Sequence, residues 1–506
     1  METVKLVVEY VTLIGAVIFM VINLNRLMLV FQQKHYYFSS LLASYYSKWN
    51  LLVLVLIPVI FFADYIIVQV LSLVIMFVII FFQKRKKVIG LVYTNRIIRL
   101  LISNVIILTA ISTLLLKAIA FPGLLSVLAC DVILLPIFFI ISALLVLPIE
   151  ILISRYYQYR AKQKVKLINP TVIAVTGSFG KTTTKNIIYE CLKHKYITYK
   201  TPKSYNTNNG ISKDINDSLN KLTEMAVLEF GACRSGDIEK LCKFINPDIA
   251  VITAVGLQHL KTFKSLSNIY REKTVVLDYA KVAYVNYEIV QNYNIKSNAK
   301  IVTFGKSDAA DWYVTNVKQK LGKLEFIITN HQIKIKAKTS LLGKHQISNI
   351  LVSAAVAYEL GIGITEIELA ISQLEQIEHR LERKVQGDFV VLDDSYNSNI
   401  VGFLNALDVL EKEKSPRVLI TPGIVEAAEA IDNINKTLAD RISGFVEEVI
   451  IVNCESGRSL KGALESLNYK NVVAVNSYQE AMDYVLRSYS NGSILIENDV
   501  PDIYLM

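Results

Sequence analysis

The chain has 506 residues, enough for two to four domains. Hydrophobic residues make up 53% of it and its mean hydropathy is +0.39, which is too apolar for a purely soluble enzyme. Residues 1–166 carry sixteen Lys and Arg against five Asp and Glu, whereas the remainder carries 38 against 39. The net charge of +10 therefore belongs to the apolar part, and we expect no nucleic-acid partner.

The first 150 residues hold long apolar runs, and a membrane-spanning helix needs about 20 such residues. We expect five spans, with a tight helical hairpin turning near Asp64 between the second and the third. One long tilted helix is the alternative there. A signal peptide over residues 1–24 is another alternative, although no small-residue cleavage site follows it. The expected spans are 6–24, 49–63, 65–82, 97–116 and 123–149.

The orientation follows from the bias of Lys and Arg toward the cytoplasm. Five spans put thirteen basic loop residues on one side and only Lys5 and Lys117 on the other. We therefore expect an external N-terminus, a cell-membrane location and a cytoplasmic catalytic region. Asp131 falls within the last span, where an acid is a functional candidate; a place near the outer interface is the alternative. Five scattered cysteines without a CxxC pair argue against a zinc ribbon and suit a reducing compartment.

A phosphate-binding loop follows the membrane region. Residues 171–176, TVIAVT, are typical of a buried parallel strand, and a helical stretch begins after the glycines. In this context backbone N–H groups turn onto the phosphates of ATP, the lysine reaches the β- and γ-phosphates, and the first threonine can bind Mg²⁺. The ATP-binding loop is Gly177, Ser178, Phe179, Gly180, Lys181, Thr182 and Thr183.

The motif TGSFGKTTTK resembles the ATP loop of the Mur ligases, which join amino acids or peptides to cell-wall precursors. Six further motifs follow in the family's order. DDSYNSN is most similar to the subgroup that adds D-alanyl-D-alanine to a muramoyl tripeptide. These motifs are KTPKSYNTNNGI, AVLEFGACRSGDIEKL, PDIAVITAVGLQHL, LLGKHQISNILVSAAVAYELGI, EHRLE and VVLDDSYNSN.

The resemblance covers about 167–500 and implies the fold class: an α-helical transmembrane bundle followed by α/β domains. We expect a transmembrane region at 1–150, a basic cytoplasmic linker at 151–166, a P-loop Mur ligase central ATPase domain at 167–375 and a Rossmann-like C-terminal domain at 376–506. The residues independently predict alternating strands and helices, and a β-hairpin that turns near Asn330. The expected strands lie at 226–230, 249–254, 389–393, 417–420, 448–452, 472–475 and 493–496.

The family's reaction implies the chemistry. ATP phosphorylates a substrate carboxylate, and an amine then displaces phosphate to form an amide. Two Mg²⁺ ions and a lysine would hold the two negative substrates together. By resemblance, Thr182 and Glu229 hold the first metal ion, and His259 helps to hold the second. Lys273 would bind metal as a carbamate, although its surroundings, NIYREK, depart from the family's small residues.

Further residues are assigned by the same resemblance. His345 and Asn349, four apart on a predicted helix, would contact the nucleotide. Arg380 would reach the phosphates from the domain junction, and Asp394 would contact ATP, with Asn397 and Asn399 shaping its loop. Asn286 alone remains of the family's Asn-Ala-Asp-Asp. Lys181, Lys273, His259 and Arg380 are thus the expected catalytic residues.

Soluble Mur ligases carry an N-terminal domain for the UDP part of the precursor, and residues 1–150 leave no room for one. We therefore expect membrane lipids and a lipid-linked cell-wall precursor as partners, with an amino acid or peptide as the amine donor. A polyamino-acid synthase resembling poly-γ-glutamate synthase is one alternative. A non-catalytic membrane scaffold that senses nucleotide is another, and a transporter is a weaker one.

Overall fold

The computed structural model divides into two compact units, one up to Arg155 and the other from Tyr156 onward. Each is described by itself. The structure describes residues 2–33, 36, 57–62, 65–83, 90–118, 124–202, 205–256, 260–295, 297–320, 323–396, 399–424, 431–452 and 455–497.

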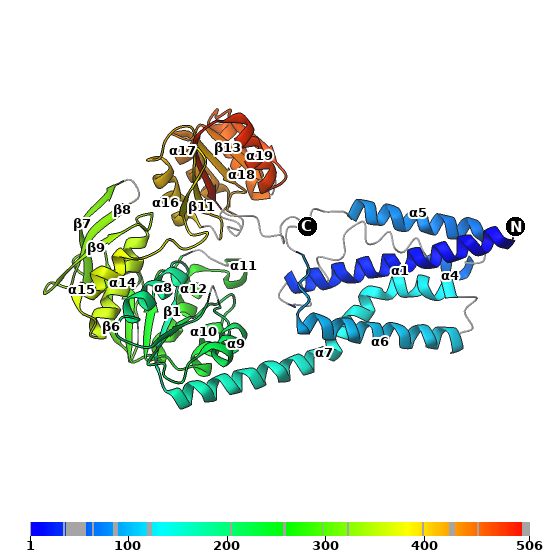
Figure 1. Cartoon of the computed structure of the whole chain (residues 1–506), viewed down its shortest axis with the longest axis horizontal. Coiled ribbons are helices and arrows are strands. Elements are labelled where there is room, and N and C mark those ends of the chain that lie inside the picture. The colour runs from blue at the N-terminus through cyan, green and yellow to red at the C-terminus, as the bar shows by residue number, and fades with distance from the viewer. Residues whose placement is uncertain are drawn as a thin grey trace. The chain divides into compact units, whose positions relative to one another are not determined.

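The first unit is helical (Figure 1). Among the described residues, three helices are long and apolar enough to cross a membrane, by length and composition only: α1, α6 and α7. The expected third span corresponds to α5, whereas most of the expected second span and the turn at Asp64 lie outside the described residues. The helices are α1 (Glu2–Gln33), α4 (Ile57–Phe62), α5 (Ile66–Gln83), α6 (Asn95–Ala118) and α7 (Leu124–Ile168).

Polar side chains of these helices turn toward one another. Asp131 on α7 is 2% exposed and accepts a 2.6 Å hydrogen bond from Ser112 on α6. Asn104 on α6 donates to the Ser142 hydroxyl at 3.2 Å. Outward faces carry exposed Val, Leu, Ile and Phe instead, as helices facing hydrocarbon require. Asp131 therefore lies inside the helical unit.

A nine-stranded sheet forms the centre of the second unit, in the order β2-β3-β1-β4-β5-β6-β7-β8-β9. Strands β2 to β7 pair in parallel, and β8 and β9 continue the sheet antiparallel, with α15 packed against β9 (Figure 1). The strands are β1 (Thr171–Thr176), β2 (Thr198–Lys200), β3 (Met225–Glu229), β4 (Ile249–Ile252), β5 (Val282–Asn286), β6 (Lys300–Gly305), β7 (Trp312–Lys320), β8 (Lys323–Thr329) and β9 (Lys334–Thr339).

Strand β1 is buried on both faces, which explains its continuous apolar sequence. Because side chains alternate along a strand, Ile173 and Val175 pack into one core and Val172 and Ala174 into another. The flanking helices are α8 (Lys181–Leu192), α9 (Asn208–Ser218), α10 (Asp237–Phe244), α11 (Leu260–Phe263), α12 (Leu266–Thr274), α13 (Tyr287–Asn292), α14 (Gln346–Glu359) and α15 (Ile364–Ser372), with a 3₁₀ turn, η2, at Val275–Asp278.

A second, six-stranded sheet has the order β10-β11-β15-β12-β13-β14, and only its edge strand β10 is antiparallel. The sheet is thus mostly parallel, and the Rossmann-like domain expected at 376–506 stays a prediction. Its elements are β10 (Glu382–Gln386), β11 (Phe389–Asp394), α16 (Ile400–Leu410), β12 (Arg417–Thr421), α17 (Ile431–Ser443), β13 (Glu448–Val452), α18 (Glu455–Ser466), β14 (Val472–Val475), α19 (Tyr478–Ser488) and β15 (Gly492–Glu497).

The expected strands are confirmed to within two residues at each end, and so is the hairpin, whose strands β8 and β9 flank His331 at φ 70°. The basic segment 151–166 is helical throughout, because α7 runs on to Ile168. Its last part packs on the second unit: Ala161 is fully buried, and Lys164 donates to the carbonyl of Ile215 at 2.9 Å. Residues 156–168 therefore fold with the α/β domains.

Candidate active site

The loop between β1 and α8 needs glycine at two positions. Gly177 has φ +144°, and a Cβ there would lie 2.1 Å from the Thr253 hydroxyl. Gly180 has φ +78° and caps α8, and its Cβ would lie 2.4 Å from the Asn349 side chain. A side chain at either position would therefore collide with a neighbour. The backbone is free to approach a phosphate, and α8 directs its N-terminus toward the loop.

Neighbouring strands hold this loop. Thr253, just after β4, donates to the carbonyl of Thr176 at 3.2 Å and to that of Phe179. Ser178 exchanges 3.1 Å hydrogen bonds with the backbone of Gly256. Because parallel strands end at one edge of the sheet, β1, β3, β4 and β5 all deliver residues to this place.

Lys181 begins α8 and lies over the loop. Its Nζ donates to the carbonyls of Gly177 at 2.9 Å and of Ser178 at 3.0 Å. Burial lowers the pKa of Lys181, the positive charge of Arg380 lowers it further, and the carboxylate of Glu229 opposes both. The ammonium group is thus in a poorly hydrated place where a phosphate would interact with it strongly.

Glu229 ends β3, in register with Val175 of β1, and is 1% exposed. Its carboxylate accepts a 2.8 Å hydrogen bond from Thr182 and a 3.1 Å bond from the Asn206 amide. The Nζ of Lys185 lies 3.5 Å away. A carboxylate and a hydroxyl thus lie side by side next to the phosphate loop.

These oxygens suit a magnesium ion. Mg²⁺ prefers oxygen ligands and is usually bound by one or two protein groups together with phosphate oxygens and water. Among the described residues, no group of three or more His, Cys, Asp or Glu side chains could hold a metal by itself. Thr182 and Glu229 therefore fit a site that the phosphates of a nucleotide complete.

Lys273 lies on α12 and is 2% exposed. Burial lowers its pKa to about 7, and the charge of Lys181 contributes to the shift. Next to it, Glu272 accepts 2.7 Å hydrogen bonds from the backbone of Gly236 and Ile238, so it caps α10 and anchors α12. A lysine that is partly neutral near pH 7 can react with carbon dioxide, as carbamate formation requires.

Asn349 and His345 sit at the start of α14. The Asn349 side chain accepts a 3.2 Å hydrogen bond from Thr184 and donates to Gln346 at 2.9 Å, so it meets the first turn of α8. His345 is the N-cap residue of α14. Burial lowers its pKa to about 4, helped by the charge of Arg380, so its ring is neutral at pH 7.

Arg380 lies between His379 and Leu381, which both have positive φ, 59° and 53°. Such backbone is costly for residues other than glycine and tends to occur at functional sites. The guanidinium of Arg380 stacks on the Tyr396 ring, 4.1 Å from the ring centre. Asp394 accepts a 3.0 Å hydrogen bond from the Leu381 amide. Burial raises the pKa of Asp394 to about 6, against the opposing charge of Arg380.

Three other residues expected at the site make structural contacts: Asn286, Thr183 and Asn399. Asn286 ends β5, caps α13 and donates to the carbonyl of Thr253 at 3.1 Å, so it supports the loop. Thr183 is buried within α8. Asn399 caps α16 through Gly402. His259 and Asn397 lie outside the described residues, and their roles remain predictions.

Four residues of the site were not predicted individually from the sequence: Lys185, Asn206, Thr253 and Glu272. Asn206 lies within the predicted substrate motif KTPKSYNTNNGI, and Lys185 closes TGSFGKTTTK, so both were inside recognised segments. Their contact with Glu229 depends on tertiary packing. Thr253 lies within PDIAVITAVGLQHL and Glu272 within NIYREK, but neither residue type marks a role there, because Thr and Glu are common at strand ends and in helices.

Comparison with known proteins agrees with this arrangement. The model of the Mur ligase middle domain matches residues 175–357. The UDP-N-acetylmuramoyl-tripeptide–D-alanyl-D-alanine ligase of Borreliella burgdorferi is 30% identical over 346 residues, covering 64% of this chain and 70% of that one. Its counterpart from Buchnera aphidicola is 30% identical over 265 residues, 51% of this chain, and the match spans only 57% of that relative's length.

Solved structures with a similar fold come from the same family. The structure of MurF ligase from Thermotoga maritima in complex with ADP matches with a TM-score of 0.60 at 22% identity, covering 70% of this chain and 81% of that one. The α/β part of this chain therefore has the fold of that structure. The chain belongs to the Mur ligase family. The family model leaves the apolar helices before residue 150 unmatched.

Proposed function

We propose that the chain forms amide bonds at the cytoplasmic face of the cell membrane, using ATP to activate a carboxylate as an acyl phosphate. The observation that carries the proposal is the 2.8 Å contact of Thr182 with Glu229 directly beside Lys181. It combines a metal-ligand pair with a phosphate-binding ammonium at a glycine loop. The relatives named above, which are ligases, support the same reaction class.

Each group of residues has its own proposed role in the reaction. Backbone N–H groups of 177–180 and the start of α8 bind the phosphates of ATP. A substrate carboxylate oxygen attacks the γ-phosphorus, the bond to the β-phosphate oxygen breaks, and ADP leaves. Lys181 and Arg380 offset the negative charge of both substrates. Thr182 and Glu229 would hold a Mg²⁺ ion, which would supply further charge neutralisation. An amine then attacks the acyl carbon, loses a proton and expels phosphate.

Lys273, as a carbamate, and His259 are proposed to complete a second metal site. As an ammonium, Lys273 would repel a cation, whereas a carbamate presents two oxygens. Its burial, its nearness to Lys181 and its pKa of about 7 support the modification. His345, Asn349 and Asp394 are proposed to contact the nucleotide.

The substrate is proposed to be a cell-wall precursor carried by a membrane lipid, and the amine donor an amino acid or peptide. The apolar helices α1, α6 and α7 support a membrane-bound substrate, because they would confine the enzyme to the membrane. Holding both partners in one thin layer raises their effective concentration, as a tether does. This confinement would replace contacts that a separate precursor-binding domain makes in a soluble ligase.

The test uses the purified full-length protein in lipid nanodiscs with ATP, Mg²⁺ and D-alanyl-D-alanine. Lipid-linked and UDP-linked muramoyl peptides are offered in parallel, and products are identified by mass spectrometry. We expect ADP, phosphate and an amide product, formed faster on the lipid-linked series. Faster turnover of the UDP-linked series would reject the membrane-bound substrate. No amide with either series, or with other amino-acid donors, would reject the ligase assignment for these substrates.

A further inference from the structure

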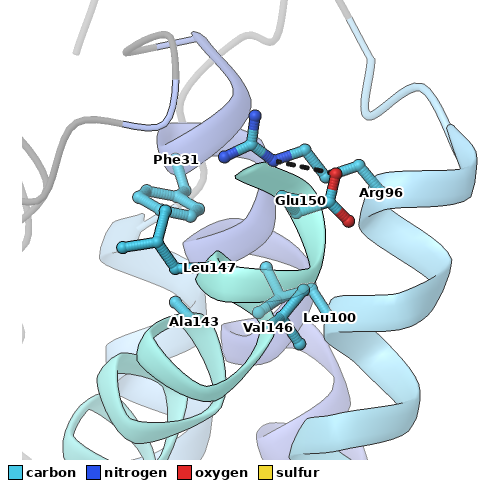
Figure 2. A pocket seen from close by; sticks show the side chains of 7 residues that line it. All are labelled: Phe31, Arg96, Leu100, Ala143, Val146, Leu147 and Glu150. Carbon is cyan, nitrogen blue, oxygen red and sulfur yellow. Dashed lines mark ion pairs between the residues drawn. The ribbon is translucent and has the colours of Figure 1, made fainter. Parts of the chain in front are cut away.

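One end of the first unit holds a small pocket between three helices. It is shallow and partly open to the outside. Figure 2 shows the Arg96 side chain reaching from α6 across Glu150 toward Phe31 of α1, above apolar side chains. The lining residues are Phe31, Arg96, Leu100, Ala143, Val146, Leu147 and Glu150.

The pocket has a fixed frame. Phe31 is 3% exposed and meets the Phe139 ring edge-on at 5.6 Å. The end of α1 is tied to the segment before α6, because the Gln32 amide donates to the Val92 carbonyl at 2.8 Å and accepts from its N–H at 3.0 Å. The apolar wall is therefore preformed, as binding sites usually are.

The rim carries more positive than negative charge. Glu150 accepts a 2.6 Å hydrogen bond from Arg99 and lies 4.0 Å from Arg96. Arg96 also stacks 3.7 Å from the centre of the Tyr36 ring. The Arg96 side chain is 32% exposed. Among the residues described here, its guanidinium makes no side-chain hydrogen bond. One carboxylate thus faces two guanidinium groups.

The position of the pocket along the helices limits the class of ligand that it can bind. It lies at the C-terminal end of α1 and the N-terminal end of α6, the side that the Lys and Arg distribution puts in the cytoplasm. Anionic headgroups are abundant there, and basic pockets between helices bind them. Arginine presents a planar fork that matches phosphate oxygens. Apolar walls below a basic rim match acyl chains below a phosphate.

We propose that this pocket binds a membrane lipid with an anionic phosphate headgroup, held by Arg96 and with a chain against Phe31 and Leu147. The proposal depends on the membrane location proposed above, but not on the ligase reaction.

The test measures lipid retention by native mass spectrometry of the full-length protein, after exchange into mixed phosphatidylglycerol and phosphatidylcholine nanodiscs. We expect phosphatidylglycerol to remain bound, and Arg96→Gln to reduce its retention about tenfold, since a hydrogen bond to a charged group contributes at least that factor. Lys117→Gln removes the same charge from the other end of α6 and should retain the lipid. Equal loss in both variants, or no preference in the wild type, would overturn the proposal.

Glu150→Gln separates lipid binding from a merely structural ion pair. If Arg96 serves only Glu150, both single variants will lose thermal stability alike and retain lipid alike, which would contradict the proposal. If Arg96 binds phosphate, Glu150→Gln will retain phosphatidylglycerol at least as well as the wild type, because a competing carboxylate is gone. Millimolar inorganic phosphate should not displace the lipid; displacement would indicate a site for soluble anions and contradict a lipid site.

Discussion

Lys185 and Glu229 form a buried ion pair, 3.5 Å between Nζ and the nearer carboxylate oxygen, with side chains 0% and 2% exposed. Burial lowers the pKa of Lys185, and the charge of Glu229 opposes this shift. A buried charge is tolerated when a partner compensates it. Lys185 therefore places a compensating charge beside the carboxylate at the end of β3, where Thr182 also meets it.

Removing only one charge of this pair should lower the stability of the fold. Lys185→Met leaves Glu229 buried without its cation, and we expect the unfolding free energy to fall by about 3–5 kcal/mol. Adding Glu229→Gln should recover part of that loss without restoring activity, because the carboxylate proposed to bind the metal ion is gone. Thermal unfolding of the single and double variants measures the coupling. Strictly additive losses would show that the pair does not interact.

Lys181→Ala should abolish ATP turnover while the protein stays in the membrane fraction. Loss of one preorganised charge at such a site lowers rates by about 10²–10³-fold or more. Phosphate release and membrane fractionation are measured on the same preparation. Lys193→Ala, which removes an exposed lysine just after α8, is the matched control. A near wild-type rate for Lys181→Ala would reject the ATP site.

Lys273 gives a pH-dependent prediction. Because its pKa is lowered to about 7, the neutral amine rises from about a tenth at pH 6 to about nine tenths at pH 8. Only the neutral amine forms a carbamate, so labelling by carbon-13 bicarbonate should increase over this range. Mass spectrometry or NMR detects the label.

The matching variants test the role of the modification. Lys273→Ala should lose activity that formate or acetate partly restores, whereas Arg271→Ala, exposed on the same helix, should not. Full activity of Lys273→Ala would remove the carbamate from the mechanism.

Cys233 should report nucleotide binding. It is exposed and within electrostatic reach of Lys181 and Lys273. Burial raises the pKa of Cys191 and of Cys242 to about 12, so these two remain unreactive thiols. We expect iodoacetamide to modify Cys233 before them, and MgATP to slow the reaction. Peptide mapping follows it. The same rate with and without MgATP would place Cys233 away from bound nucleotide.

The orientation can be tested with tags. A tag after residue 506 should be cytoplasmic and one before residue 1 external, because the basic loop residues favour this arrangement. Protease protection in spheroplasts distinguishes the two sides, with a known cytoplasmic protein as the control. Both ends on the same side would mean an even number of spans and exclude five.

The sequence predicted the α/β part closely because its signals are local. The apolar run 171–176 and the glycines after it indicated β1 and the loop, and the strands at 448–452 and 472–475 were found in full. What it missed depends on contacts between distant segments. Lys185 reaches Glu229 once β3 pairs with β1, and Asn206 reaches it once β2 pairs with β3. The positive φ of His379 and Leu381 leaves no mark in the composition.

The end of α7 sets where a soluble catalytic fragment can begin. A chain cut at residue 167 would uncover the apolar neighbours of Ala161 and delete the bonds from Lys164 to the ends of α9. Such a fragment should aggregate, whereas one that starts at Tyr156 keeps this face covered. The last turns of α7 are therefore part of the core of the α/β domains. A genetic exchange of anchors between relatives would have to join the two proteins upstream of Tyr156.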